Sequence, residues 1–163
     1  MILIASEANV RLYEFKPNLF SLVPFQMEKL TFIRKLRFLY EFLCGGYKIY
    51  YLQIDSNFVG YCLVTPGGRR LKCSTTKDIV IGPYFISPEF RGKGYAKILI
   101  KMTFTFCTYR YNKIFCWIHK TNISSIKTVM ACGMTTNGLR LNVVGKFRRL
   151  ILNDLGEYIV YIK

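Results

Sequence analysis

A strand-like segment, a glycine-rich turn and a helix-like segment follow one another between residues 79 and 109 of this chain. Residues 79–86 are apolar and rich in β-branched side chains, as strands are, but Gly82-Pro83 interrupts them. Because proline has no N–H to donate to a sheet, we expect a β-bulge there, with backbone groups left unpaired. Residues 97–109 carry apolar side chains at helical spacing. A strand, a helix and the next strand together predict a parallel, right-handed crossover.

The turn between these segments, residues 91–96 (Arg-Gly-Lys-Gly-Tyr-Ala), is suited to hold an anion. The first N–H groups of a helix have no partner within it, and the helix dipole adds positive charge there. Gly92 and Gly94 allow close approach of a ligand, while Arg91, Lys93 and Lys97 supply cations. We therefore predict a diphosphate at this turn, with a plain helix start as the alternative. The nucleotide-binding loops that end in Gly-Lys-Ser/Thr or read Gly-x-Gly-x-x-Gly are excluded, because neither pattern occurs.

The rest of the chain predicts a mixed α+β fold in a single domain spanning residues 1–163, since no repeat, linker or low-complexity tract interrupts it. A hairpin is expected around the turn at Asp55-Ser56-Asn57, and Gly45-Gly46 should end a helix. The expected elements are strands at 10–15, 47–54, 58–65 and 113–118, helices at 26–43 and 122–132, and tail strands at 139–144 or 147–152 and at 157–162.

Two motifs resemble those of the GNAT N-acetyltransferase superfamily. Arg91-x-x-Gly94-x-Ala96, after a strand, is similar to its acyl-CoA signature, Gln/Arg-x-x-Gly-x-Gly/Ala. Asn122-x-x-Ser125, with Gly133-Met134 beyond it, is similar to a second motif of that superfamily. The resemblance covers residues 78–134 well and the N-terminal half by element order. It implies a twisted, mostly antiparallel sheet flanked by helices, in which the fourth and fifth strands are parallel and splay apart.

The resemblance also implies the cosubstrate, acetyl-CoA, and a reaction that needs no metal. The pantetheine arm would run between the splayed strands, where an N–H just past the bulge would polarise the thioester carbonyl. Asn122 would reach the arm from the far wall, although it also suits a helix N-cap, and both can hold. The expected cosubstrate-binding residues are Phe85, Ile86, Arg91, Gly92, Lys93, Gly94, Tyr95, Ala96, Lys97, Asn122 and Ser125.

The catalytic side chains of the superfamily are not where the resemblance would put them. Seven residues after Asn122, where many relatives carry a tyrosine acid, the chain has Val129, and Val80 takes the place of a glutamate base. Tyr84, His119 and Asp78 are the substitutes that we expect, because Tyr84 lies near the predicted bulge, Asp78 starts the same strand and His119 ends the next one. Each has a structural alternative: a core tyrosine, a surface histidine and a turn carboxylate.

The charge of the chain is strongly unbalanced, with 24 Lys and Arg against 9 Asp and Glu and a net charge of +15. Residues 91–163 hold 13 of the basic and 2 of the acidic side chains, so an anionic ligand should meet this half. The acceptor is expected to be a primary amine on a small molecule. Arg140, Lys146, Arg148 and Arg149 hint at an anionic one such as a nucleotide-linked amino sugar. A cationic acceptor would need Glu7, Glu14 or Glu28 at the cleft.

Two other functions fit parts of the sequence. A fold of this kind could bind acyl-CoA without turning it over, and a basic surface with exposed aromatic side chains could bind nucleic acid. The six cysteines show no metal-binding spacing, and no signal peptide or run of 18 apolar residues occurs, which favours a cytoplasmic protein with reduced thiols and no membrane span. The oligomeric state is open, a homodimer included.

Overall fold

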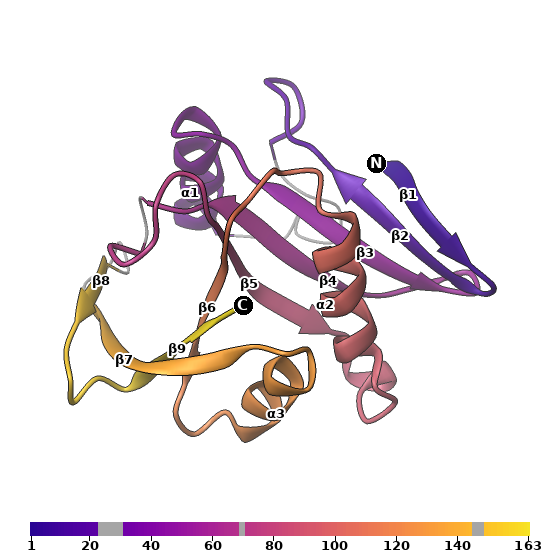
Figure 1. The fold of residues 1–163 in the computed structure, drawn as a ribbon. Coiled ribbons are helices and arrows are strands. Elements are labelled where there is room, and N and C mark those ends of the chain that lie inside the picture. Colours follow the sequence, from indigo (N-terminus) through magenta and orange to yellow (C-terminus); the bar gives the residue numbers. More distant parts are fainter. Residues whose placement is uncertain (23–30, 69–70, 145–148) are drawn as a thin grey trace.

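The computed structural model describes residues 1–22, 31–68, 71–144 and 149–163, whose strands form one sheet in the order β1-β2-β3-β4-β5-β6-β9-β7-β8 (Figure 1). Neighbouring strands are antiparallel except β5 and β6, which are parallel. The strands are β1 (Ile2–Glu7), β2 (Val10–Phe15), β3 (Lys48–Ile54), β4 (Asn57–Pro66), β5 (Ile79–Ile86), β6 (Ile114–His119), β7 (Thr135–Val144), β8 (Arg149–Leu152) and β9 (Tyr158–Ile162). The helices are α1 (Phe32–Leu43), α2 (Tyr95–Phe106) and α3 (Ile123–Ala131), with a 3-10 turn at Pro88–Phe90.

The helices pack on opposite faces of this sheet. Phe38 and Phe42 of α1 pack against a cluster of buried side chains that includes Tyr47 and Leu63. On the other face, buried side chains of α2 and α3 join a larger cluster with the strands. Because side chains alternate between faces along a strand, the central strands are apolar on both sides. None of the described helices has both the length and the apolar character needed to cross a bilayer.

The sheet is irregular in the two places where the sequence predicts it. Gly82 and Pro83 together lie opposite Leu63, because the register of β4 and β5 shifts between Cys62 and Val64. This confirms the bulge, which gives β5 one residue more than its partner. Beyond that point β5 stays paired with β4 alone.

The parallel strands β5 and β6 pair through two residue pairs only, Ile79 with Ile114 and Val80 with Phe115. Beyond these pairs β6 stays with β9, so the two strands part, which confirms the expected splay. Asp78 holds the closed end together, because its Oδ1 accepts a hydrogen bond from the N–H of Lys113 at 3.1 Å. These are the fourth and fifth strands of the resemblance, numbered one higher because of the strand β1.

Several predicted elements differ from the structure. The strand β1 was not predicted, and α2 begins and ends a few residues before the expected 97–109. Of the predicted helix 26–43, residues 26–30 lie outside the described residues, and α1 spans the later part and ends before Gly45-Gly46 as expected. Both tail alternatives are strands, β7 and β8, which pair with each other, while residues 147 and 148 lie outside the described part.

Candidate active site

The turn before α2 presents a row of unpaired backbone donors. In the described part of the chain, no acceptor lies within hydrogen-bond range of the N–H groups of residues 92–96. Gly92 and Gly94 both have a φ of +79°, a left-handed conformation in which other residues are strained. A Cβ at either position would meet nothing within 4 Å, so both glycines border open space. The turn therefore has the geometry of an anion site.

Basic side chains surround these donors. Arg91 is held in place, since its Nε donates to the carbonyl oxygen of Ile86 at 3.0 Å and its guanidinium lies 5.5 Å from the ring centroid of Phe85. The Nζ of Lys93 lies 5.7 Å from the ring centroid of Phe90, and Lys97 is exposed in the first turn of α2. The turn thus combines unpaired backbone N–H groups with the cationic side chains of Arg91, Lys93 and Lys97, and both kinds of group bind phosphate.

The backbone of β5 next to this turn faces the gap between the splayed strands. The N–H of Ser87 donates to Val59 of β4, and Ile86 lies directly opposite Gly60. Because amide groups point to alternate sides along an antiparallel strand, those of Ile86 and Tyr84 point away from β4, towards β6. The bond from Arg91 to the oxygen of Ile86 agrees with this direction. The Tyr84 N–H is thus the first amide past the bulge that faces the gap.

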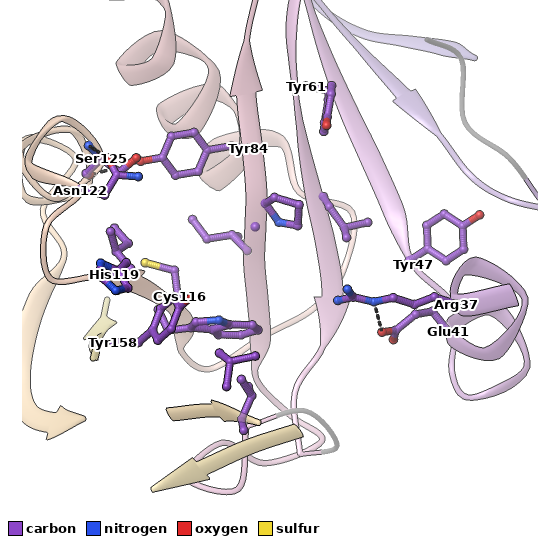
Figure 2. A pocket seen from close by; sticks show the side chains of 18 of the residues that line it. Arg37, Glu41, Tyr47, Tyr61, Tyr84, Cys116, His119, Asn122, Ser125 and Tyr158 are labelled. Carbon is purple, nitrogen blue, oxygen red and sulfur yellow. Dashed lines mark hydrogen bonds and ion pairs between the residues drawn. The ribbon is translucent and has the colours of Figure 1, made fainter. Parts of the chain in front are cut away.

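A cavity of about 570 Å³ opens where the two strands part, and its walls come from both faces of the sheet (Figure 2). On the α2 and α3 face it is lined by Ile81, Tyr84, Cys116, Ile118, Asn122 and Ser125. On the α1 face it is lined by Arg37, Phe38, Glu41, Tyr47, Tyr61, Leu63, Trp117, His119, Val143, Leu150 and Tyr158. We call these the donor half and the acceptor half. The cavity thus connects the two faces through the sheet.

In the donor half, Tyr84 reaches from β5 to the start of α3. Its hydroxyl donates to the carbonyl oxygen of Ser125 at 3.2 Å, and Figure 2 shows the ring pointing towards Asn122 and Ser125. Burial raises the pKa of Tyr84 to about 12, so the hydroxyl keeps its proton at neutral pH. Asn122 is the N-cap of α3, with its Oδ1 accepting from the Ser125 N–H at 3.2 Å. Its side-chain amide nitrogen can donate to a ligand.

Comparison with known proteins agrees with this arrangement. The profile of the Acetyltransferase (GNAT) family matches residues 12–134, about three quarters of the sequence. The chain belongs to the GNAT acetyltransferase family. No curated protein sequence matches it.

Solved GNAT structures share the fold at low sequence identity. RimL, a ribosomal L7/L12 α-N-protein acetyltransferase solved with CoA, is 12% identical, with a TM-score of 0.65 over 99% of this chain and 97% of its own. YncA, a putative acetyltransferase from Salmonella typhimurium solved with acetyl-CoA, is 14% identical, with a TM-score of 0.58 over 93% and 92%. Spermidine N-acetyltransferase from Vibrio cholerae, solved with CoA and spermine, is 15% identical, with a TM-score of 0.58 over 93% and 94%.

Two positions where GNAT relatives carry catalytic side chains are part of the core here. Val129 and Val80 are fully buried and belong to separate apolar clusters. No side-chain acid or base can act from either position.

Asp78 has a structural role in this GNAT chain and does not line the cavity. Its carboxylate accepts bonds from the N–H and hydroxyl of Thr75, at 2.7 and 2.8 Å, and from the N–H of Lys113. Burial alone would raise its pKa, but these bonds and the charge of Lys113 lower it below the ordinary value. The oxygens of Asp78 therefore close the base of the splayed strands and do not reach a ligand in the cavity.

His119 lines the acceptor half at the end of β6. Its Nδ1 lies 2.8 Å from the hydroxyl of Thr121 and 3.3 Å from the Thr121 N–H, which donates to it. Its Nε2 lies 3.6 Å from a carboxylate oxygen of Glu157, and its ring packs edge-on against Tyr158, with centroids 5.0 Å apart. Because Nδ1 accepts from an N–H, a neutral ring carries its proton on Nε2, towards Glu157.

Sequence reasoning missed most of the acceptor half. Arg37, Trp117 and Tyr158 come from one helix and two strands that meet only in the folded chain. The one usable signal was the spacing of Arg37 and Glu41, four residues apart on a predicted helix, which makes them neighbours on one of its faces. Of Glu7, Glu14 and Glu28, neither Glu7 nor Glu14 lines the cavity, and Glu28 lies outside the described residues.

Proposed function

We propose that this protein transfers the acetyl group of acetyl-CoA to a primary amine, directly, in a complex that holds both substrates. The observation that carries this proposal is the row of unpaired N–H groups at residues 92–96, next to a cavity that passes through the sheet. A diphosphate bound at this turn leaves the arm of the same molecule beside the gap between β5 and β6. The acceptor then approaches from the opposite face, where α1 and the acceptor half lie.

The donor-binding residues follow from their positions. The N–H groups from Gly92 to Ala96 bind the diphosphate, with Arg91, Lys93 and Lys97 around it. Phe85 supports the guanidinium of Arg91 with its ring, and Ile86 offers its N–H to the arm. Asn122 and Ser125 line the opposite wall of the gap. Apart from the ring of Phe85, which acts through Arg91, each group is a hydrogen-bond donor or a cation and so suits the phosphates and amide carbonyls of acetyl-CoA.

Tyr84 has two roles in this proposal. Its backbone N–H faces the gap just past the bulge, where it donates to the thioester carbonyl as negative charge develops on that oxygen. A preorganised donor of this kind contributes about 3–4 kcal/mol to acyl transfer. Its hydroxyl, held by Ser125 and protonated at neutral pH, gives a proton to the departing thiolate.

The reaction also needs a group that takes a proton from the attacking amine. His119 is the proposed acceptor. In the neutral ring Nε2 already carries the proton that faces Glu157, so the proton of the amine goes to Nδ1, where the Thr121 hydroxyl accepts from the new N–H and the contact with the Thr121 N–H is given up. The imidazolium formed in this way has the Thr121 hydroxyl at Nδ1 and the Glu157 carboxylate near Nε2. The amine nitrogen then forms its bond to the carbonyl carbon as the carbon–sulfur bond breaks, which leaves an amide and a thiol.

Binding and turnover are tested separately. Thermal unfolding with acetyl-CoA at about 100 times its dissociation constant should show about 2.7 kcal/mol of added stability, and dephospho-CoA and duplex DNA are the comparisons. Release of free CoA thiol should then require an amine. A shift with acetyl-CoA but no thiol release with any amine would indicate a protein that binds acyl-CoA without turning it over, a reading that the buried Val80 and Val129 favour. No shift with acetyl-CoA would contradict the whole proposal.

A further inference from the structure

Aromatic rings form much of the wall of the acceptor half. They come from α1, β4, β6, β9 and the residue before β3, and belong to Phe38, Tyr47, Tyr61, Trp117 and Tyr158. Figure 2 shows Tyr47 on the α1 side of the cavity and Tyr158 on the opposite side, beside His119. Walls of this kind bind a ligand by removing its apolar surface from water and by stacking on its rings.

Two aliphatic side chains add to this wall. Val143 of β7 and Leu150 of β8 both line the acceptor half, and the two residues are direct partners across their strands. Both are partly buried, and neither side chain has a polar atom. Because side chains alternate between faces along a strand, Ile151 points the other way; it is 51% exposed and does not line the cavity.

Several polar groups of the acceptor half are already bonded to protein. The Nε of Arg37 lies 4.0 Å from a carboxylate oxygen of Glu41, so these two charges pair with each other. The hydroxyl of Tyr47 donates to the carbonyl oxygen of Leu22, which leaves the ring as its contribution to the wall. A molecule in this half therefore gains more from apolar contact than from new hydrogen bonds.

We infer that the acceptor carries its amine on an apolar or aromatic body, as an arylalkylamine does. The inference rests on the proposed function and names the class of acceptor for it. A cavity of about 570 Å³ is of the size that holds small molecules. The rings and the aliphatic pair then surround the body, and its amine points to the gap between β5 and β6.

Apolar surroundings also favour the chemistry of the acceptor. A primary amine is mostly an ammonium ion at neutral pH, and only its neutral form attacks a thioester. Burial among apolar side chains disfavours the charged form and so lowers the pKa of the amine. His119 lies at this wall, with its ring centroid 5.0 Å from that of Tyr158, and takes the remaining proton.

Two other classes of acceptor fit this half less well. A polyamine would bury further ammonium groups where the described lining residues offer one carboxylate, that of Glu41, which Arg37 already meets. A nucleotide-linked amino sugar was suggested by basic residues of the tail. Of these, Arg140 is exposed and does not line the cavity, while Lys146 and Arg148 lie outside the described residues.

The test compares acetyl transfer to amines that differ in the body that carries the amine. Ethylamine, butylamine and phenethylamine form a series of rising apolar surface, and glucosamine and spermidine are the polar and polycationic comparisons. We expect kcat/KM to rise about fourfold for each CH₂ group that becomes buried. Phenethylamine should exceed both glucosamine and spermidine at least about 10-fold, because each of these would bury polar or charged groups without partners.

Leu150→Gln changes the chemistry of the wall at similar size. It should lower the ratio of kcat/KM for phenethylamine to that for ethylamine about 10-fold, because the longer amine loses apolar contact. The ratio compares two substrates of one variant, so a general loss of active protein does not change it. Ile151→Gln is the matched control and should leave the ratio within about twofold. If Leu150→Gln lacks the wild-type acetyl-CoA thermal shift, Val143→Thr replaces it, with an expected drop of about threefold.

Equal kcat/KM values for ethylamine and phenethylamine, or a higher value for glucosamine or spermidine, would overturn the inference. A ratio that is unchanged in both Leu150→Gln and Val143→Thr would also overturn it, because the wall would not contact the acceptor. An acetyl-CoA shift without thiol release from any of the five amines contradicts catalysis in the proposed function. The absence of that shift contradicts cosubstrate binding, so both failures are distinct from a failed preference.

Discussion

Tyr84 presents two hydrogen-bond donors to one gap, its backbone N–H in the plane of the sheet and its hydroxyl above it. The bulge at Gly82 and Pro83 shifts the register of β5 just before this residue. A single residue can therefore serve both the carbonyl oxygen and the sulfur of a thioester. The two donors respond differently to mutation, because a side-chain change leaves the backbone N–H in place.

Tyr84→Phe should lower kcat about 100-fold, because the thiolate loses its proton donor while the backbone donor remains. The KM for acetyl-CoA and the thermal shift should change by less than about threefold. Since burial raises the pKa of Tyr84 to about 12, its ionisation should not limit the rate of the wild-type protein below about pH 11. Steady-state thiol release from pH 6 to 10 measures both effects.

Tyr111→Phe is the control for that substitution. Its hydroxyl also donates to a backbone carbonyl, that of Phe104 at 2.8 Å, but it does not line the cavity. A kcat for Tyr84→Phe equal to that of this control would remove the hydroxyl from the mechanism.

At this scale, the sequence predicts residues whose role is local and misses those that depend on contact between distant segments. Gly92, Gly94 and Asn122 stand at a turn and a helix start, where backbone conformation follows from the residue type, and the structure has all three in those places. Arg37 and Trp117 come together only because α1 and β6 reach the same cavity. The apolar pattern of a buried strand does not reveal whether a given side chain faces a cavity or packs against a helix.

Helix α2 connects the proposed binding turn to a buried polar network. The unpaired donors lie in the turn before the helix and in its first two residues, and the network lies just beyond its other end. There the hydroxyl of Thr108 donates to Glu14, which also accepts from Tyr50 at 2.8 Å and pairs with Lys48 at 3.2 Å. Glu14 and Lys48 are each less than a tenth exposed. The network therefore ties the end of α2 to β2 and β3.

Gly94→Glu should abolish the acetyl-CoA thermal shift. The substitution puts a strained residue and a negative charge beside the unpaired N–H groups, which repels phosphate. Gly138→Glu is the matched control, because Gly138 also has a positive φ and open space around it but lies on β7. A full shift in Gly94→Glu, with the control also unaffected, would rule out the turn as the binding site.

Glu14→Gln should reduce the free energy of unfolding by about 3 kcal/mol, because it leaves the charge of Lys48 buried without a counter-ion. Urea unfolding at pH 7 measures the loss. Glu157→Gln should cost less than about 1 kcal/mol, since its ion pair with Lys120 is half exposed. Similar losses in the two variants would mean that the buried network does not anchor the helix.

The elements themselves were largely predictable, and their ends less so. The hairpin, the bulge and the helix after the glycine turn follow from local patterns in residues 47–106. The strand β1 was missed because its period-2 pattern is weak, and Ile2 and Leu3 are exposed at the edge of the sheet. Its pairing with β2, a contact that local pattern does not reveal, identifies it as a strand.

For the whole molecule, the free energy of unfolding should be lowest at acidic pH. Burial alone would raise the pKa of Glu14, but its bonds to Thr108 and Tyr50 and the charge of Lys48 lower it, and the pKa of Asp78 is lowered in a similar way. A carboxyl whose pKa is lower in the folded state adds stability above its unfolded pKa, about 4, and loses it as pH falls further.

The free energy of unfolding should therefore be nearly constant from pH 7 to about 5 and should fall steadily below about pH 4. Urea unfolding between pH 3 and 7 tests this. Glu14→Gln and Asp78→Asn, although less stable at pH 7, should each show a shallower decline than the wild type. A decline as steep in both variants would assign the acid sensitivity to other groups.

The two residue pairs between β5 and β6 have a mechanical consequence. Strands β1–β5 and strands β6–β9 are joined within the sheet by these two pairs, which lie next to the hydrogen bond between Asp78 and Lys113. A pantetheine arm bound between β5 and β6 would hydrogen-bond to the backbone groups that these strands do not share with each other. It would thereby restrict the motion of one part of the sheet relative to the other. Amide hydrogen exchange along the open edges of both strands should then slow when the cosubstrate is bound, at sites far from any phosphate.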